Sequence, residues 1–274
     1  MGNAAEHAAI TAHWSRRDPA AWIMARLAAE QVQTPQWRDV ARFDQIHAGG
    51  LQAVRELAEL CAISRDWQVV DLGGGLGGAA RALSGTYGCA LTCVDLTPTL
   101  IDAGERLTTL VGLQRYVRHL EADATATGLA DAAYDLVWVQ HLALHLPEPL
   151  ALWREAARLL KPGGLLAVHE WVLGSGEPYY PAPWAPADGS LSHLGSQAEL
   201  EARLTAAGFI DIRLQDVSAT AAEGYARQLK ALARQPQADN PVLPAEELGL
   251  VIANAERSLR EGRARCLMGT ARRA

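Results

Sequence analysis

The sequence predicts an α/β fold in which a parallel sheet is covered by helices on both faces. Between residues 67 and 171, apolar segments of strand length alternate with helical segments, an order that implies right-handed crossovers. A cluster of glycines directly follows the first of these strands, at residues 73–78. The 274 residues are 49% hydrophobic and 20% charged, which is enough apolar material for a large core.

The individual elements are expected in the following order. Residues 10–48 are helical in pattern and interrupted at Pro19 and Pro35, which predicts two or three short helices. Apolar residues at helical spacing predict a helix at 51–61, and further helices are expected at 79–86, 98–111, 149–160, 196–207, 221–234 and 245–261. The expected strands are 67–72, 89–95, 116–122, 134–140, 165–171, 209–217 and 266–271.

Composition narrows the class of partner and the compartment. A net charge of −6 gives no overall positive field, so nucleic acid is not an expected partner. The four cysteines form no C-x-x-C pair and indicate buried thiols in a reducing compartment: Cys61, Cys89, Cys93 and Cys266. No signal peptide and no apolar run of about 20 residues is present, so we expect a cytoplasmic protein without a membrane partner.

The glycine cluster predicts a nucleotide site. Gly73, Gly75 and Gly78 satisfy the G-x-G-x-x-G pattern at the carboxyl end of the first strand, where doubly wound sheets bind nucleotides. Asp95 ends the second strand, where its carboxylate can accept hydrogen bonds from both hydroxyls of a ribose. The glycine pattern and Asp95 suit NAD as well as other nucleotide cofactors, so an NAD enzyme is kept as a rival hypothesis at this point.

Three later segments distinguish the rivals. Asp123 ends the third strand, Tyr134-Asp135-Leu136-Val137 begins the fourth, and Leu160-Lys161-Pro162-Gly163-Gly164 leads into the fifth. With the glycine loop and Asp95, this ordered set strongly resembles the class I S-adenosylmethionine (SAM)-dependent methyltransferases over roughly residues 68–271. The resemblance implies a Rossmann-like, doubly wound, seven-stranded sheet with the last strand inserted antiparallel beside the fifth. The NAD interpretation gives these three segments no role.

Residues 44–50, Asp-Gln-Ile-His-Ala-Gly-Gly, are similar to the small-molecule branch that includes sarcosine and dimethylglycine methyltransferases. The helical pattern at the N-terminus predicts a collar or lid (1–48), and a SAM-binding domain (49–274) is expected after it. Within that domain we expect a substrate lid, the Pro- and aromatic-rich loop 173–196, and a helical insertion at 221–261. The insertion suits either a homodimer interface or a lid.

The resemblance also assigns roles to single residues. The methionine part of SAM is expected on Asp71, Gly73, Gly74 and Gly75. Asp95 and Leu96 would frame the ribose and adenine, and Asp123 and Ala124 would hold the adenine edge. Gln140 would lie beside the methionine moiety and the transferred group. Many relatives have Gly-Cys-Gly where this chain has Gly73-Gly74-Gly75, a change we expect to be harmless because backbone contacts dominate.

Histidines near the strand ends are the candidates for a general base, if the acceptor needs one: His141, His145, His169 and His47. His145 is preferred because it follows Gln140 in the loop that faces the site, although a structural histidine bonded to backbone explains it equally well. Aromatic residues of the collar, the fifth strand and the long loop are expected with His47 around the acceptor: Trp14, Trp171, Tyr179, Tyr180 and Trp184. We expect no metal.

Three functions follow from this set of residues. The first is methyl transfer from SAM to a small-molecule acceptor, with nitrogen expected ahead of oxygen or carbon. The second is another reaction of SAM on the same scaffold, such as cyclisation of its aminobutyrate chain with release of methylthioadenosine. The third is a noncatalytic SAM-binding protein, which the intact glycine loop and aromatic lid disfavour.

Overall fold

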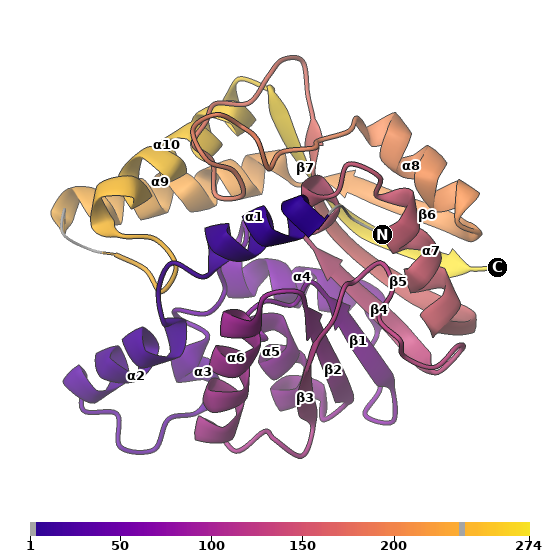
Figure 1. Cartoon of the computed structure of the whole chain (residues 1–274), viewed down its shortest axis with the longest axis horizontal. Coiled ribbons are helices and arrows are strands. Elements are labelled where there is room, and N and C mark those ends of the chain that lie inside the picture. Colours follow the sequence, from indigo (N-terminus) through magenta and orange to yellow (C-terminus); the bar gives the residue numbers. More distant parts are fainter. Residues whose placement is uncertain (1–3, 236–238) are drawn as a thin grey trace.

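The computed structural model describes residues 4–235 and 239–274. Its centre is a seven-stranded sheet in the order β3-β2-β1-β4-β5-β7-β6 (Figure 1). The strands are β1 (Gln68–Leu72), β2 (Ala90–Asp95), β3 (Val117–Glu121), β4 (Tyr134–Gln140), β5 (Leu160–Leu173), β6 (Phe209–Asp216) and β7 (Ala264–Arg273). The pairs among β1 to β5 are parallel, whereas β7 is antiparallel to both β5 and β6. The predicted fold class, including the antiparallel last strand beside β5, is confirmed.

The helices cover both faces of this sheet. They are α1 (Ala4–Trp14), α2 (Pro19–Ala29), α3 (Trp37–Val40), α4 (Gly50–Cys61), α5 (Gly78–Tyr87), α6 (Pro98–Leu110), α7 (Leu150–Leu159), α8 (Gln197–Ala206), α9 (Ser218–Arg234) and α10 (Ala245–Arg260). One hydrophobic cluster joins the sheet to α4 and α5, and a second joins its opposite face to α7 and α8. No helix of the described ranges is long and apolar enough to cross a membrane.

Several boundaries differ from the predicted ones for physical reasons. Pro19 is the first residue of α2 because Asp18 caps that helix, its carboxylate accepting a hydrogen bond from the Ala21 amide at 2.9 Å. β5 begins at Leu160 and therefore includes the expected Lys-Pro-Gly-Gly turn, which the sheet accommodates with a register shift opposite Tyr134 and Leu136. α9 begins at Ser218, three residues before the expected start. Of the expected collar, residues 1–3 lie outside the described residues.

Three segments that are far apart in the sequence meet at the carboxyl ends of the parallel strands. In Figure 1, α1 crosses the middle of the molecule, with α9 and α10 on one side and α2, α3 and α6 on the other. The loop between β5 and α8 packs its buried Ala182, Trp184 and Ala185 into the same hydrophobic cluster as α9 and α10. The amide of His193 in this loop donates to the carbonyl of Leu144 at 2.7 Å. Helices α1, α9 and α10 and the loop between β5 and α8 thereby cover the carboxyl ends of the parallel strands.

Candidate active site

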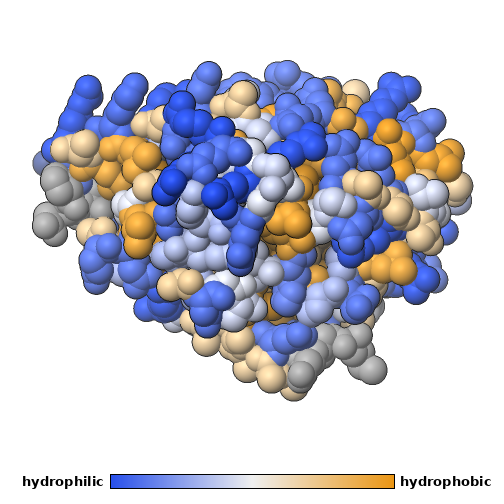
Figure 2. All heavy atoms as spheres, turned by 90° about the horizontal axis from the view of Figure 1, so that it is seen from above, coloured by the Kyte–Doolittle hydropathy of each residue, from blue (hydrophilic) through white to orange (hydrophobic). Residues whose placement is uncertain are grey.

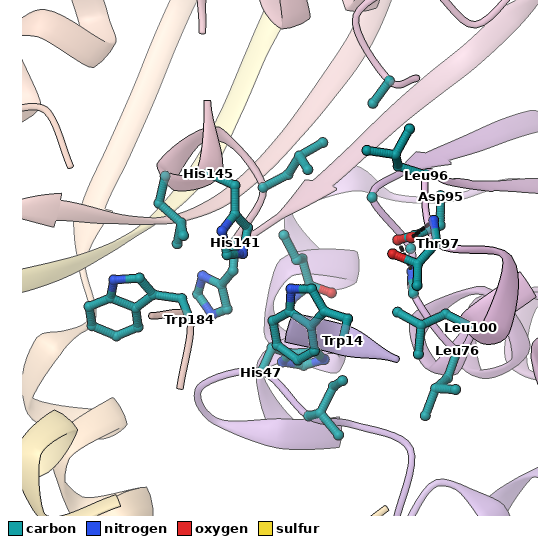
Figure 3. A pocket seen from close by; sticks show the side chains of 18 of the residues that line it. Trp14, His47, Leu76, Asp95, Leu96, Thr97, Leu100, His141, His145 and Trp184 are labelled. Carbon is teal, nitrogen blue, oxygen red and sulfur yellow. Dashed lines mark hydrogen bonds between the residues drawn. The ribbon is translucent and has the colours of Figure 1, made fainter. Parts of the chain in front are cut away.

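A cavity lies beneath these helices and this loop and brings most of the predicted site residues together. Its volume is about 160 Å³. The predicted residues that line it are Trp14, His47, Asp71, Gly73, Gly74, Gly75, Asp95, Leu96, Asp123, Ala124, Gln140, His141, His145, Trp171 and Trp184. In Figure 3, Asp95, Leu96 and Thr97 lie at one end, His141, His145 and Trp184 at the other, and Trp14 and His47 between them. The cavity therefore has a carboxylate end and an aromatic, imidazole-rich end.

The glycine loop closes the carboxylate end. The amides of Gly73 and Gly74 both donate to the carbonyl of Val94, at 2.8 and 3.0 Å, which folds the loop back over β2. Gly73 has a φ of 73°, and a Cβ there would stand 2.8 Å from the Leu142 side chain. A Cβ on Gly74 would meet Cys93 Sγ at 2.5 Å. Glycine is required at these two positions because the side chains of Leu142 and Cys93 pack directly against the loop.

Asp95 holds the loop from the next strand. Its Oδ2 accepts from the amide of Gly75 and its Oδ1 from the amide of Thr97, each at 2.9 Å. Burial raises the pKa of this carboxyl above its ordinary range, and these two amides oppose the rise. Asp95 therefore orders the loop and lines the cavity at once.

The Asp71 carboxyl lies next to the glycine loop and has one oxygen without a hydrogen-bond donor among the described residues. Its side chain is 2% exposed, and Oδ2 has no hydrogen-bond partner in the described part of the chain. Burial, reinforced by the nearby charge of Asp95, raises the pKa of Asp71 to about 7. A buried carboxyl of this kind is suited to receive a cationic or hydrogen-bond-donating ligand group.

Asp123 lies just beyond the end of β3. Its Oδ1 accepts from the amide and the hydroxyl of Thr125, at 2.8 and 2.7 Å, and Oδ2 lies 3.6 Å from Nε2 of His7. The imidazole of His7 reaches this carboxylate from α1. The N-terminal helix is thereby connected to the carboxylate end of the cavity.

Gln140 is held by two side chains in the cavity wall. Its Oε1 accepts from the indole N–H of Trp138 at 2.8 Å, and its Nε2 donates to Nδ1 of His169 at 3.1 Å. Since this arrangement assigns the amide oxygen and nitrogen, His169 must carry its proton on Nε2, next to Cys266 Sγ at 3.1 Å. Gln140 thus positions His169 as well as lining the cavity.

The preferred histidine, His145, and its neighbour His141 both have lowered pKa values, which favour the neutral imidazole. His145 is buried, its Nδ1 lies 3.3 Å from the carbonyl of Leu191, and its ring meets Trp14 edge-on at 6.0 Å. Burial is the main cause that lowers the pKa of His145 to about 4, and it lowers the pKa of His141 well below the ordinary value. His145 therefore makes the bond to backbone that a structural histidine would make.

His141 is strained and incompletely bonded. Its φ is 55°, which is uncommon for any residue other than glycine. Nε2 accepts from the amide of Ala48 at 3.2 Å, whereas the buried Nδ1 has no partner among the described residues. Strain and an unpaired polar atom in one cavity residue are typical of functional positions.

Of the five aromatic residues predicted around the acceptor, Trp14, Trp171 and Trp184 line this cavity, and Tyr179 and Tyr180 lie outside its lining. The rings of Trp171 and Trp184 lie 4.4 Å apart between centroids. Tyr179 and Tyr180 do not belong to the lining of this cavity. Tyr179 donates its hydroxyl to Glu261 and packs against two arginine side chains, while the Tyr180 hydroxyl bonds the hydroxyl of Ser192. Both tyrosines are therefore occupied in fixing the loop.

Sequence reasoning also missed residues of the lining, among them His7, Ile10, Asp44, Ile46, Leu76, Thr97, Leu100, Leu144, Pro183 and Tyr225. Thr97 could have been found from its position after Asp95. His7 and Tyr225 come from helices outside the motifs, and no sequence pattern marks them. The described lining includes no lysine or arginine.

Comparisons with known proteins agree with this geometry. Residues 70–168 match the family model described as "Methyltransferase domain". A glycine/sarcosine/dimethylglycine N-methyltransferase of Actinopolyspora halophila is 30% identical over 201 residues, which are 73% of this chain and 34% of the relative. A sterol 24-C-methyltransferase of Eremothecium gossypii is 32% identical over 117 residues, 43% of this chain and 31% of the relative. The chain thus spans about a third of the length of these two relatives.

A solved structure shows the same fold. It comes from Galdieria sulphuraria and is described provisionally as a sarcosine dimethylglycine methyltransferase. It superimposes with a TM-score of 0.71 at 23% identity, over 82% of this chain and 86% of that one. The resemblance to SAM-dependent methyltransferases, with SAM as cofactor, is confirmed.

Proposed function

We propose that this chain, which carries a class I SAM-dependent methyltransferase domain, transfers the methyl group of SAM to a nitrogen of a small-molecule acceptor. The observation that carries the proposal is the two-ended cavity, with Asp95 at one end and Trp184 at the other, and with Asp71, Asp123, Trp14 and Trp171 also in its lining. The relatives with matching sequence include both an N-methyltransferase and a C-methyltransferase by name. Nitrogen is favoured because the lining residues that the structure describes include no lysine and only histidines with lowered pKa values at the aromatic end.

The residues at the carboxylate end fit SAM. The cradle formed by Gly73 and Gly74 leaves no room for side chains, and the unpaired Oδ2 of Asp71 faces the same region. In our proposal Asp95 takes the ribose hydroxyls and Asp123 the adenine edge, while the glycine loop and Asp71 hold the methionine part. Bound SAM supplies an electrophilic methyl group on a sulfonium. The chain must then hold the acceptor in line with that group and exclude water.

The acceptor end suggests the kind of molecule that is methylated. Trp14, Trp171, Trp184 and Tyr225 present aromatic surface, and the imidazoles beside them are neutral. Such a wall attracts an amine with an apolar body, in neutral or cationic form. An acceptor that carries a carboxylate, as sarcosine does, would find no guanidinium or ammonium among the described lining residues. We therefore propose an amine without a carboxylate.

The reaction needs no base from the chain. A neutral amine attacks with its own lone pair, and the proton it then carries can leave to water after product release. His145 holds its imidazole against the Leu191 carbonyl and shapes the wall beside Trp14. Gln140 lines the same cavity and is held by Trp138 and His169. Their expected roles are to position the acceptor.

The test is an assay for the adenosyl product by mass spectrometry, with SAM alone and with a panel of amines, carboxylated amines, phenols and enolisable carbonyls. S-adenosylhomocysteine formed only with carboxylate-free amines supports the proposal. Turnover with phenols or carbon acceptors would refute nitrogen, and turnover with sarcosine would refute the carboxylate argument. Methylthioadenosine without an acceptor would show chemistry on SAM itself, and tight SAM binding without any product would show a binding protein.

We further propose a cytoplasmic location and a homodimer formed through α9 and α10. All four cysteines are free and buried, which suits a reducing compartment.

The exposed apolar residue that suggests a dimer interface is Leu250 on α10, which is 55% exposed. The face in Figure 2 shows separate hydrophobic patches among hydrophilic residues rather than one continuous apolar surface. Light scattering after size exclusion measures the assembly, and a monomeric mass at micromolar concentration would contradict the dimer.

A further inference from the structure

Three imidazoles meet at the acceptor end of the cavity. His47 comes from the segment before α4, His141 follows β4, and His169 lies within β5. One ring nitrogen of each lies within 4.8 Å of those of the other two. The ring centroids of His141 and His169 are 4.4 Å apart, and His47 lies 6.1 and 6.3 Å from them. Three segments thus bring nitrogen atoms to one point, although each histidine is isolated in the sequence.

The outer partners of two rings leave a nitrogen directed to the cluster. The tautomer assigned to His169 donates from Nε2 toward Cys266 and leaves the lone pair of Nδ1 free to accept. Both nitrogens of His47 face carbonyl oxygens, with Nδ1 3.2 Å from Ala48 O and Nε2 3.2 Å from Gln45 Oε1. The neutral ring donates to one of them, and a proton on Nδ1 leaves the Nε2 lone pair facing the Gln45 oxygen without a donor. Metal-bound histidines characteristically donate their second N–H to an acceptor of this kind.

His141 gives the strongest indication that the cluster has a ligand. Its Nδ1 is buried without a partner among the described residues, and its backbone is held in the left-handed region. The loop after it is fixed by Glu170, whose Oε1 accepts from the amides of Leu142 and Ala143, each at 2.9 Å. Because Nε2 accepts from the Ala48 amide, the neutral ring carries its proton on Nδ1, and the fold maintains a strained residue with an unsatisfied N–H. To bind a metal through Nδ1, the ring must move this proton to Nε2 and give up the bond from Ala48.

We propose that His47, His141 and His169 bind one divalent first-row transition-metal ion, with Zn²⁺ as the reference ion, and that its remaining coordination position faces the cavity. Imidazole nitrogen suits these ions, and a three-histidine set with an open fourth position is an established type of zinc coordination. His47 and His141 belong to the cavity lining and His169 lies behind it, so the open position points to the acceptor.

Binding requires small movements. Zn–N bonds of about 2.0–2.1 Å put the three nitrogens roughly 3.4 Å apart, so the rings must approach one another. Three contacts of 3.1–3.2 Å would be given up: Gln140 to His169, Gln45 to His47, and the Ala48 amide to His141. Three coordinate bonds outweigh the two hydrogen bonds given up, those of Gln140 and of the Ala48 amide, because the Gln45 oxygen meets the Nε2 lone pair of His47 without a proton between them. The site is independent of which acceptor atom receives the methyl group.

The experiment is a titration of the metal-free full chain, without a histidine tag, with Zn²⁺ against a chromophoric chelator. We expect one equivalent to bind, and Co²⁺ in its place to give the intense visible bands of four- or five-coordinate cobalt. Loss of a residue that only contacts a ligand weakens metal binding by roughly 100-fold at most. His47→Gln and His141→Gln each remove a ligand, so each should weaken Zn²⁺ binding by more than that. Cys266→Ser, which keeps all three ligands, should weaken it by about 10–100-fold or less.

The matched control is His145→Gln, since His145 lines the same cavity but stands outside the cluster. It should bind Zn²⁺ as the unmodified chain does. Circular dichroism and SAM binding verify that each variant is folded. His47→Gln remains informative if His141→Gln, directly after β4, fails to fold. The proposal is overturned if the unmodified chain binds no equivalent of Zn²⁺, if both cluster variants retain full affinity, or if His145→Gln loses as much as they do.

Discussion

The guanidinium of Arg81 and the carboxylate of Asp44 form a buried ion pair, with Nη2 2.8 Å from Oδ2 and both side chains about 1% exposed. Arg81 also donates to the carbonyl of Leu76 at 2.6 Å and to the hydroxyl of Thr108 at 3.0 Å. One side chain on α5 therefore connects the segment that carries His47 with the glycine loop and α6. The shape of the cavity depends on this connection.

Removing one partner of this pair should be more harmful than removing both. Asp44→Leu leaves the Arg81 charge buried without its counterion, and we expect a loss of about 3–5 kcal/mol in the free energy of unfolding. The double variant Asp44→Leu/Arg81→Met should recover a large part of that loss because no charge stays buried. Urea denaturation of the single and double variants measures the difference. Strictly additive losses would show that the two side chains act independently.

Gly74 is matched to Cys93 on the neighbouring strand. A Cβ at position 74 would lie 2.5 Å from Cys93 Sγ and 2.7 Å from Asp71 Oδ2. Gly74→Ala should therefore lower stability by about 1–3 kcal/mol, the usual cost of overpacking. Cys93→Ala/Gly74→Ala should be closer in stability to Cys93→Ala alone, since the sulfur has gone. Equal losses with and without Cys93 would assign the cost to the Asp71 contact. Thermal unfolding of the four proteins decides between them.

The sequence predicted the parts of the fold that depend on local pattern. The glycine loop, Asp95, Asp123 and Gln140 lie at ends of successive strands, so their approach followed from the α/β topology alone. The His47, His141 and His169 cluster could not be predicted, because it requires the register of β4 on β5 and the exact course of the segment before α4. The position of Tyr179 outside the cavity lining could not be predicted for a similar reason, since its arginine and glutamate partners come from the distant end of α10 and the residues after it.

Asp95 should govern the affinity for SAM. Asp95→Ala removes the acceptor for the ribose hydroxyls and also releases the Gly75 amide, so we expect the dissociation constant of SAM to rise about 10–100-fold. Isothermal titration measures it. Asp102→Ala is the control, because Asp102 carries the same charge on the exposed face of α6. A change of less than about threefold for Asp95→Ala would remove this residue from the cofactor site.

Asp71 should make stability depend on pH. Its pKa is raised from the ordinary 3.8 to about 7 by burial, so the native state keeps a proton that the unfolded chain releases. This contribution is complete below about pH 4 and is lost as the pH rises towards 7, by up to about 4 kcal/mol at 1.36 kcal/mol per unit. Asp71→Asn carries no titrating group, so its stability relative to the unmodified chain should increase from pH 5 to pH 8. Urea denaturation at both values tests this, and a constant difference would mean that Asp71 is ionised throughout.

The aromatic wall should determine the affinity for the acceptor without altering that for SAM. Trp184→Leu removes a ring that packs on Trp171 at the end of the cavity furthest from Asp95, as Figure 3 shows for Trp184. For an amine acceptor we expect KM to rise about fivefold or more, the equivalent of one cation–π contact of about 1 kcal/mol, while Trp184→Phe should lie between. Tyr179→Leu is the control, since its ring lies outside the cavity lining and packs against Arg257 and Arg263. Steady-state kinetics with the acceptor identified by mass spectrometry gives these KM values. An unchanged KM in Trp184→Leu, or an equal rise in Tyr179→Leu, would place the acceptor elsewhere.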